Sequence, residues 1–331
     1  MSNLSLSDFD FHLPDELIAQ TPAHPRDSAR LLVYDRATRR IHDSVFRDLG
    51  DWLHPDTTLV MNNSKVEKAR LLNGSMEIFI VRQINPTMCE ALIRPGKKFR
   101  VGKTVDWADG IRVETLSVSE DGLRTLRFDR PIDDPSWDAF RQTPFPPYIQ
   151  ADETMADEYQ TVYAKPEGSK AAPTAGLHFT TELLETLALK HPLAEVTLHV
   201  GLGTFAPVKS DRIEDHKMHS EWCSIDDFTA ATLSRAAHLT AVGTTTTRVL
   251  ESLVRPGRAF EASSGDTDIF ITPGYDWKAV DALITNFHLP KSTLLMLVAA
   301  LTGVDELQRI YAHAIAERYR FYSFGDAMLI R

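Results

Sequence analysis

The spacing of apolar residues changes twice along this chain, and the changes mark its organisation. Residues 31–35 and 57–61 are short apolar runs typical of buried strands. Between residues 77 and 128, short β-rich segments are separated by turn signals such as Asn85-Pro86 and Pro95-Gly96. This middle stretch predicts a small antiparallel sheet or barrel.

After a proline-rich connection at residues 131–147, predicted strands alternate with predicted helices. A period near 3.6 residues and a polar residue at the start predict capped amphipathic helices at residues 180–191, 226–239 and 305–320. A shorter helix is predicted at residues 14–19, with Pro14 in its first turn. Intervening strands are predicted at residues 195–200, 240–243 and 267–272. The whole pattern indicates an α/β domain interrupted by a β-rich insertion.

Composition places the chain among globular proteins. Its 331 residues are 43% hydrophobic and 25% charged, so disordered and fibrous classes are excluded. The longest apolar run, around residues 294–300, is far shorter than the roughly 20 residues that span a bilayer, and no basic and then apolar leader opens the chain. We therefore expect a cytoplasmic protein without a membrane partner. Cys89 and Cys223 are too few and too far apart for a disulfide framework.

The charge is unevenly distributed. The chain carries a net charge of -10, but the stretch from Lys65 to Lys103 holds nine Lys or Arg against three Glu, a local balance of +6. A basic segment on an acidic protein is what a phosphate backbone would select. A solvated sheet face with alternating Lys and Arg explains the charge equally well, so both interpretations stay open.

Three stretches place polar and conformationally special residues in apolar surroundings: residues 168–179, 197–207 and 284–296. Each contains a histidine, His178, His199 or His288, within a few residues of a Gly or Pro. Glycine and proline shape the backbone tightly, and histidine can titrate or donate near neutral pH. The three stretches predict an active site assembled from loops.

A turn rich in threonine, residues 243–247, sits where a predicted strand ends and a helix begins. The unpaired amides and the positive end of the helix dipole would suit a carboxylate or a phosphate. A helix cap with spare hydroxyl groups is the favoured alternative for such a turn on its own. Arg248 and Glu251, three residues apart in that helix, are expected to be able to pair.

A metal site is a competing interpretation of the stretch from His216 to Cys223. His216, His219 and Cys223 are residue types that ligate zinc. His216 and His219 have a helical spacing, whereas His219 and Cys223 alternate as on a strand, and no second ligand pair has a matching spacing. A polar cluster at a domain or substrate interface is therefore favoured, and we expect no metal.

Several long strings resemble one enzyme family. They are residues 159–164 (YQTVYA), 171–179 (AAPTAGLHF), 197–205 (TLHVGLGTF), 216–221 (HKMHSE), 280–298 (VDALITNFHLPKSTLLMLV) and 319–328 (YRFYSFGDAM). In this order they resemble the S-adenosylmethionine:tRNA ribosyltransferase-isomerases of queuosine biosynthesis. The resemblance begins at Phe11 and continues to the end of the chain.

The resemblance implies a fold, a reaction and partners. The fold is α/β, a mixed-sheet α/β domain (residues 1–64 and 151–331) with an inserted small antiparallel β-barrel domain (residues 65–150). The implied reaction transfers and isomerises the ribosyl part of S-adenosylmethionine, the co-substrate, onto 7-aminomethyl-7-deazaguanine at the wobble position of a tRNA. The products are epoxyqueuosine-tRNA, adenine and methionine. A cytoplasmic monomer is expected.

The needs of this reaction assign roles to residues. The sulfonium acidifies the 5′-methylene, so a general base is required, and we expect His178 or His288 in that role. Asp326 either protonates or hydrogen-bonds adenine, or caps loop amides. The expected substrate-binding residues are Thr174, Gly176, His199, Thr244, Thr245, Arg248 and Asn286. The expected tRNA-binding residues are Lys65, Lys68, Arg70, Lys97, Lys98 and Arg100. Tyr159, Tyr163 and Phe179 are candidates for stacking on the unpaired wobble base, although core packing is the favoured role for isolated aromatic residues.

The chain departs from the family pattern in places. Lys65 replaces an arginine, Lys68 a proline and Lys170 an aliphatic residue, and the loop at residues 71–77 is short. A lysine lacks the forked donor of arginine, so a phosphate clamp at Lys65 would be weaker. These changes bear on substrate affinity and tRNA choice more than on reaction class. Two rival hypotheses remain open: a relative that binds tRNA without catalysis, and an enzyme that uses S-adenosylmethionine for methyl transfer or a metal at His216 and His219 for hydrolysis.

Overall fold

The chain forms two compact units in the computed structural model, which describes residues 4–331 except 109, 121, 151–152, 202 and 204–211. Unit 1 comprises Met1–Lys65 and Pro146–Arg331, and unit 2 comprises Val66–Phe145. The insertion was predicted at residues 65–150. Among the described residues, no helix is both long enough and apolar enough to cross a membrane.

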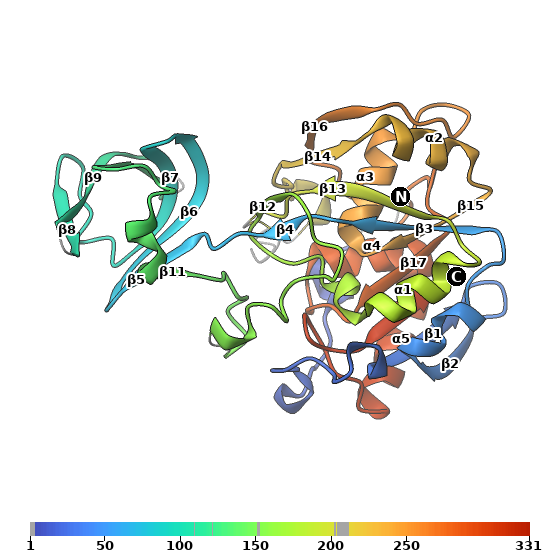
Figure 1. Ribbon diagram of the computed structural model, residues 1–331. Coiled ribbons are helices and arrows are strands. Elements are labelled where there is room, and N and C mark those ends of the chain that lie inside the picture. The colour runs from blue at the N-terminus through green and yellow to red at the C-terminus, as the bar shows by residue number, and fades with distance from the viewer. Residues whose placement is uncertain (1–3, 109, 121, 151–152, 202, 204–211) are drawn as a thin grey trace. The chain divides into compact units, whose positions relative to one another are not determined.

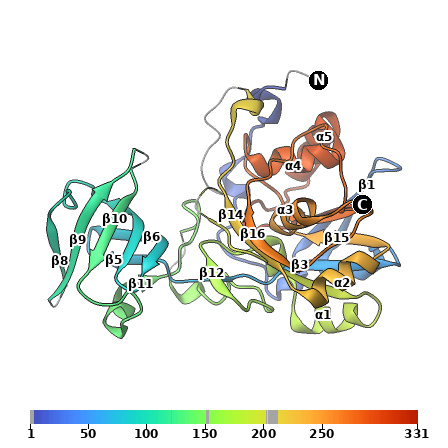
Figure 2. The ribbon, with the colours of Figure 1, turned by 90° about the horizontal axis from the view of Figure 1, so that it is seen from above.

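Unit 1 is built on a nine-stranded mixed sheet (Figures 1 and 2). The strands are β1 (Arg30–Asp35), β2 (Arg40–Val45), β3 (Thr57–Asn62), β13 (Leu193–Leu198), β14 (Glu221–Ile225), β15 (His238–Val242), β16 (Ser263–Thr267), β17 (Ala282–Asn286) and β18 (Ala327–Ile330). Their order is β16-β14-β13-β3-β15-β17-β18-β1-β2. The four strands from β13 to β17 in this order are parallel, whereas β14 and β18 run antiparallel to their inner neighbours. The carboxyl ends of β13, β3, β15 and β17 therefore meet at one edge.

Helices cover both faces of this sheet. They are α1 (Thr181–Ala188), α2 (Asp227–Arg235), α3 (Thr244–Leu253), α4 (Thr293–Thr302) and α5 (Val304–Ala316). The alternation of β1 shows the two faces, because Leu31 and Val33 pack in the cluster that contains α1, while Leu32 packs in the cluster that contains the other four helices. The expected mixed-sheet α/β fold is thus confirmed.

The helix starts follow the predicted capping chemistry, with one exception. The hydroxyl of Thr180 accepts a hydrogen bond from Leu183 N at 3.1 Å, and the carboxylate of Asp226 accepts one from Thr229 N at 2.7 Å. The helix predicted at residues 305–320 instead starts at Val304, after Gly303, and ends at Ala316. Gly303 also ends α4, and its φ of 85° lets the chain turn between the two helices.

Three segments differ from the prediction. The strand expected at residues 267–272 is β16 at Ser263–Thr267, because this polar edge segment pairs antiparallel with β14 while Ile271 is buried in the core. Helix α4 was not predicted, since it is apolar on nearly every side and lacks an amphipathic period. The segment after Pro14 forms one 3₁₀ turn, Asp15–Leu17.

Short 3₁₀ helices make up much of the remaining regular structure. They are η1 (Leu6–Phe9), η2 (Asp15–Leu17), η3 (Arg26–Ser28), η4 (Phe46–Asp51), η5 (Pro135–Phe140), η6 (Glu153–Met155), η7 (Thr174–His178) and η9 (Ile213–Asp215). Two short strands, β4 (Lys65–Val66) and β12 (Glu167–Ser169), form a two-stranded sheet.

Unit 2 is a seven-stranded antiparallel sheet that curls into a half-barrel (Figure 1). Its strands are β5 (Arg70–Asn73), β6 (Met76–Asn85), β7 (Met88–Arg94), β8 (Thr104–Ala108), β9 (Ile111–Val118), β10 (Arg124–Phe128) and β11 (Arg141–Gln142), in the order β11-β5-β6-β7-β10-β9-β8. The sheet encloses its own core, in which Trp107, Trp137 and Phe99 are buried.

Candidate active site

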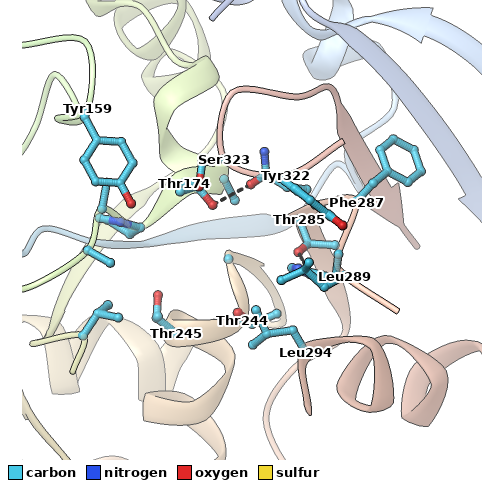
Figure 3. A pocket seen from close by; sticks show the side chains of 18 of the residues that line it. Tyr159, Thr174, Thr244, Thr245, Thr285, Phe287, Leu289, Leu294, Tyr322 and Ser323 are labelled. Atoms are coloured by element: carbon cyan, nitrogen blue, oxygen red, sulfur yellow. Dashed lines mark hydrogen bonds between the residues drawn. The ribbon is translucent and has the colours of Figure 1, made fainter. Parts of the chain in front are cut away.

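The edge where the parallel strands end carries a pocket (Figure 3). It encloses about 670 Å³ of space between protein atoms, the open solvent at its mouth included. Its walls come from Ala171–Ala175, Gly243–Thr245 and Thr285–Leu289, together with Tyr148, Tyr159, Val200, Leu294, Tyr322 and Ser323. Ligands of open α/β sheets commonly bind at such carboxyl ends. All three predicted stretches therefore contribute to this pocket, the second of them through Val200.

The start of α3 forms one wall of the pocket. No side chain among the described residues caps this helix, because the hydroxyls of Thr246 and Thr247 donate backwards to the carbonyls of Val242 and Gly243, at 2.7 and 3.2 Å. Thr244 and Thr245 line the pocket, and Figure 3 shows them on the side opposite Thr174 and Ser323. The first-turn amides and the helix dipole make this end suitable for an anion.

Asn286 connects His178 to the pocket. Its Nδ2 lies 3.1 Å from His178 Nε2, and its Oδ1 accepts a hydrogen bond of 2.9 Å from the hydroxyl of Thr174. Asn286 and Thr174 line the pocket, whereas His178 is buried behind them and does not. Burial, with the charges of Arg320 and Arg26, lowers the pKa of His178 to about 3, so its ring is neutral.

His288 lies in the pocket wall itself. Its Nε2 is 2.8 Å from the Thr285 hydroxyl, and its backbone amide donates to the Tyr311 hydroxyl at 3.0 Å. Burial lowers the pKa of His288 to about 3. The ring is therefore neutral at physiological pH and can accept a proton or a hydrogen bond from a ligand.

Asp326 is occupied by backbone and arginine donors. The amides of Arg30 and Arg320 donate to its carboxylate at 3.1 and 2.8 Å, and the Arg320 guanidinium lies 3.2 Å away. It is only 2% exposed and does not line the pocket. These contacts correspond to the capping alternative that the sequence left open.

Gly176 and His199 lie outside the pocket. A Cβ at Gly176 would collide with the Tyr163 hydroxyl, so the glycine permits close packing of η7. His199 Nδ1 lies 2.8 Å from the Ser64 hydroxyl, and its ring stacks on Trp222 with centroids 5.1 Å apart. Val200, the next residue along the chain, does line the pocket.

Arg248 forms a buried ion pair with Glu221 and does not pair with Glu251. The two side chains are 7% and 4% exposed, and Arg248 Nη2 also donates to the Thr267 carbonyl at 3.2 Å. Glu251 instead accepts from the amides of Ala279 and Val280 at 3.0 and 2.9 Å. The predicted i, i+3 pair is therefore not formed, because Arg248 and Glu251 each have partners in other elements.

The stretch from His216 to Cys223 forms the wall of a smaller cavity. His216, His219, Glu221 and Arg248 line it, and it shares Leu294 with the main pocket. Cys223 is buried in β14. Within the described part of the chain, no group of three or more His, Cys, Asp or Glu could hold a metal ion. The second predicted stretch, residues 197–207, is described only in part. Its residues 202 and 204–207, and Val208 after it, lie outside the described residues.

Of the three aromatic residues expected to stack on a base, only Tyr159 lines the pocket. Tyr163 and Phe179 are buried in the core cluster that contains α1, in line with the packing role favoured for isolated aromatic residues. Burial raises the pKa of the Tyr163 hydroxyl, and Phe179 is fully enclosed.

Two residues of the pocket wall and one residue beside it were not predicted from the sequence as site residues. Tyr148 and Ser323 line the pocket, with their hydroxyl oxygens 2.9 Å apart, and burial raises the pKa of Tyr148 to about 12. Asn62 is fully buried at the end of β3 and donates to the Thr245 hydroxyl at 3.2 Å and to the Leu198 carbonyl at 3.0 Å. Asn62 therefore fixes the start of α3 against β13; its polar type at the end of an apolar run was the available signal.

The residues expected to bind tRNA are at or near the surface. Lys65, in unit 1, pairs with Glu167 at 2.7 Å. In unit 2, Arg70 pairs with Glu77 at 2.8 Å, while Lys68, Lys97, Lys98 and Arg100 are exposed. The last three lie in the turn that follows β7.

Comparisons with known proteins cover nearly the whole chain. The model of the family described as queuosine biosynthesis protein matches residues 6–330. An enzyme named S-adenosylmethionine:tRNA ribosyltransferase-isomerase from Desulfitobacterium hafniense is 47% identical over 340 residues, 99% of this chain and 100% of that protein. The enzyme of the same name from Thermotoga petrophila is 48% identical over 337 residues, with the same coverage.

A solved structure agrees with the sequence comparisons. The crystal structure of S-adenosylmethionine tRNA ribosyltransferase from Thermotoga maritima aligns with a TM-score of 0.57 and 39% identity, covering 98% of this chain and 100% of that chain. Because the family model and the relatives extend over almost every residue, the chain belongs to the queuosine biosynthesis protein family.

Proposed function

We propose that this protein is an S-adenosylmethionine:tRNA ribosyltransferase-isomerase. It transfers and isomerises the ribosyl part of S-adenosylmethionine onto 7-aminomethyl-7-deazaguanine at the tRNA wobble position. Epoxyqueuosine-tRNA, adenine and methionine are the products. The observation that carries the proposal is a single pocket that combines an uncapped helix start with a neutral buried histidine, in a chain that aligns end to end with enzymes of this name.

The start of α3 is the proposed site for the methionine carboxylate. Thr244 and Thr245 line the pocket at the positive end of the helix dipole, and Asn62 holds Thr245 in place. The charge of Arg248 is engaged by Glu221, although its Nε has no partner among the described residues. Arg248 therefore supports carboxylate binding from the adjoining smaller cavity, where its positive charge is already balanced by Glu221.

His288 is the proposed general base. The sulfonium of S-adenosylmethionine acidifies the 5′-methylene, and His288, whose ring is neutral, lines the same pocket. An imidazole with a pKa of about 3 is a weak base, so substrate binding has to strengthen it. A carboxylate bound at the start of α3 would do so, because a nearby negative charge favours the protonated ring.

The other candidate residues act through their neighbours in this proposal. His178 orients Asn286 and, through it, the Thr174 hydroxyl, which are available for ribose hydroxyls or the deazaguanine edge. Asp326 anchors Arg320, whose charge helps to keep His178 neutral. His199 and Gly176 support the backbone around the pocket, and Tyr159 offers a ring for the base.

The tRNA backbone is proposed to contact the basic residues Lys65, Lys68, Arg70, Lys97, Lys98 and Arg100. Unit 2 contains 13 Lys or Arg and 12 Asp or Glu, whereas the chain as a whole has a net charge of -10, so the insertion is the less repulsive part for an anionic partner. We further expect a monomer that acts in the cytoplasm.

Release of adenine tests the function. The protein is incubated with S-adenosylmethionine and an anticodon stem-loop carrying 7-aminomethyl-7-deazaguanine, and small molecules are separated by chromatography. We expect adenine and methionine in equal amounts, and only when the stem-loop is present. S-Adenosylhomocysteine in place of adenine would indicate a methyltransferase, and binding of the stem-loop without any product would indicate a non-catalytic relative.

Substitution of His288 tests the site. Loss of a general base lowers rates by about 10²- to 10⁴-fold, so His288→Gln should lower kcat by at least about 100-fold while changing the KM for S-adenosylmethionine little. His313→Gln is the control, because His313 lies on α5, pairs with Asp43 and does not line the pocket. Equal activity of the two variants would remove His288 from the proposed chemistry.

A further inference from the structure

In unit 2, one arginine side chain holds the turn that follows β7. Arg124, at the start of β10, donates through Nε to the Phe99 carbonyl at 3.0 Å and through Nη2 to the Gly96 carbonyl at 3.4 Å. Its Nη1 donates to the Gly122 carbonyl at 3.3 Å. A single guanidinium thus connects the turn after β7 to the turn before β10.

The turn itself is compact and anchored. Lys98 N donates to the Pro95 carbonyl at 3.2 Å, and Phe99 N donates to the Gly96 carbonyl at 3.3 Å. Phe99 is fully buried in the core of unit 2. The three basic residues on either side of this anchor, Lys97, Lys98 and Arg100, are exposed, and none of them forms an ion pair with another described residue.

Arg124 also keeps its positive charge available. Its guanidinium donates to three carbonyls, and no carboxylate of the described residues forms a salt bridge with it. Gly96 allows the close approach, since a Cβ at that position would lie 2.8 Å from Arg124 Nη2. Four cationic side chains are therefore gathered around one turn with a fixed backbone.

We propose that Arg124 is a positioning residue for tRNA binding: it fixes the turn at residues 95–100 so that Lys97, Lys98 and Arg100 present a preformed site to the phosphate backbone. This inference rests on the proposed function. Fixing the backbone in advance lowers the ordering cost of binding, and each phosphate contact releases counterions. Arg124 acts through the turn and is not assigned a contact with the RNA.

Two kinds of variant separate positioning from direct contact. Arg124→Gln removes the charge and the guanidinium donors. Arg124→Lys keeps the charge but has all its donors on one nitrogen, without the planar fork whose three nitrogens reach the three carbonyls. Gly96→Ala leaves every charge in place and displaces the guanidinium with its new Cβ. In the full-length protein, each should weaken binding of the anticodon stem-loop by about fivefold or more, with Lys no better than Gln.

A double-mutant cycle completes the test. In a Lys97→Gln, Lys98→Gln, Arg100→Gln background, Arg124→Gln should change stem-loop affinity less than about twofold, because the groups that it positions are gone. The KM for tRNA should rise in the single variants, while kcat at saturating tRNA stays within about twofold of the unaltered protein.

Several results would overturn the inference. Full affinity in Arg124→Lys would indicate a direct phosphate contact, and full affinity in Gly96→Ala or Arg124→Gln would indicate that the turn needs no brace. An undiminished effect of Arg124→Gln in the triple background would indicate a general loss of structure. Absence of salt-dependent stem-loop binding by the unaltered protein would refute the proposed function as well, which distinguishes the two failures.

Discussion

His178 and His288 differ in what they can touch although burial gives both the same low pKa of about 3. His288 lines the pocket, whereas His178 reaches it through Asn286. The two histidines have similar sequence contexts, so the sequence alone made either of them a candidate for the general base. The difference depends on a hydrogen bond between η7 and β17, elements 108 residues apart, which no local pattern contains.

The low pKa of His288 predicts how stability depends on pH. The folded pKa lies below the ordinary value of 6.5, so the unfolded chain binds the proton more tightly and protonation favours unfolding. The contribution of His288 is fully present above about pH 6.5 and is lost as the pH falls toward 3. Urea unfolding measures the free energy of unfolding at pH 5.5 and at pH 4.5, about 1 pH unit apart. We expect this free energy to fall by about 1.4 kcal/mol less in His288→Gln than in the unaltered protein. An equal fall in both proteins would mean that the buried ring titrates normally.

The buried pair of Arg248 and Glu221 predicts a large stability effect. Glu221→Gln leaves the guanidinium charged and uncompensated in a site only 7% exposed. We expect a loss of about 3–5 kcal/mol in the free energy of unfolding. Glu167→Gln, which breaks the exposed pair with Lys65, is the control and should cost less than about 1 kcal/mol. Equal losses, measured by urea unfolding, would show that the pair is not isolated from solvent.

At the scale of elements, the start of α3 depends on the backbone of Gly243. Gly243 has φ 91° and ψ 154°, and Gly303 at the start of α5 has φ 85° and ψ 154°. A Cβ would meet no atom closer than 3.6 Å at Gly243 and none within 4 Å at Gly303. The two glycines are therefore a matched pair in backbone strain, but only Gly243 lines the pocket.

This pair separates strain from function. Each substitution by Ala should lower the free energy of unfolding by about 1–3 kcal/mol, because a side chain rarely adopts this conformation. Gly243→Ala should also raise the KM for S-adenosylmethionine by about tenfold, since a small shift of α3 misplaces its anion site. Gly303→Ala should leave that KM unchanged. If both variants raised the KM equally, the rise would be due to lost stability and not to the anion site.

The elements that could be predicted are those with a local signal. Thr180 and Asp226 cap α1 and α2 as the sequence indicated, and β1 and β3 coincide with apolar runs. Helix α4 and strand β16 were not predicted. Helix α4 is apolar on nearly every side, and β16 is a polar segment defined by its pairing with β14. The secondary structure of both segments depends on tertiary contacts, and a short window of sequence does not contain those contacts.

At the scale of the whole molecule, the sheet order explains why distant stretches share one pocket. Strands β3, β13, β15 and β17 are parallel and end at the same edge, so residues after each strand are brought together. The sequence indicated that the stretches with His178 and His288 belong to one site, but it did not give the strand order that unites them. Of the two residues that directly follow β13, Val200 lines the pocket and His199 does not.

The mass of the modified nucleoside decides whether the proposed ribosyl transfer takes place. The protein is incubated with S-adenosylmethionine and the stem-loop that carries 7-aminomethyl-7-deazaguanine, the RNA is digested, and the nucleoside is weighed. We expect a mass gain equal to the epoxycyclopentanediol group of epoxyqueuosine, absent with His288→Gln and retained with His313→Gln. An unchanged nucleoside mass, in a mixture where a known enzyme of this family is active and this protein binds the stem-loop, would contradict the proposed transfer.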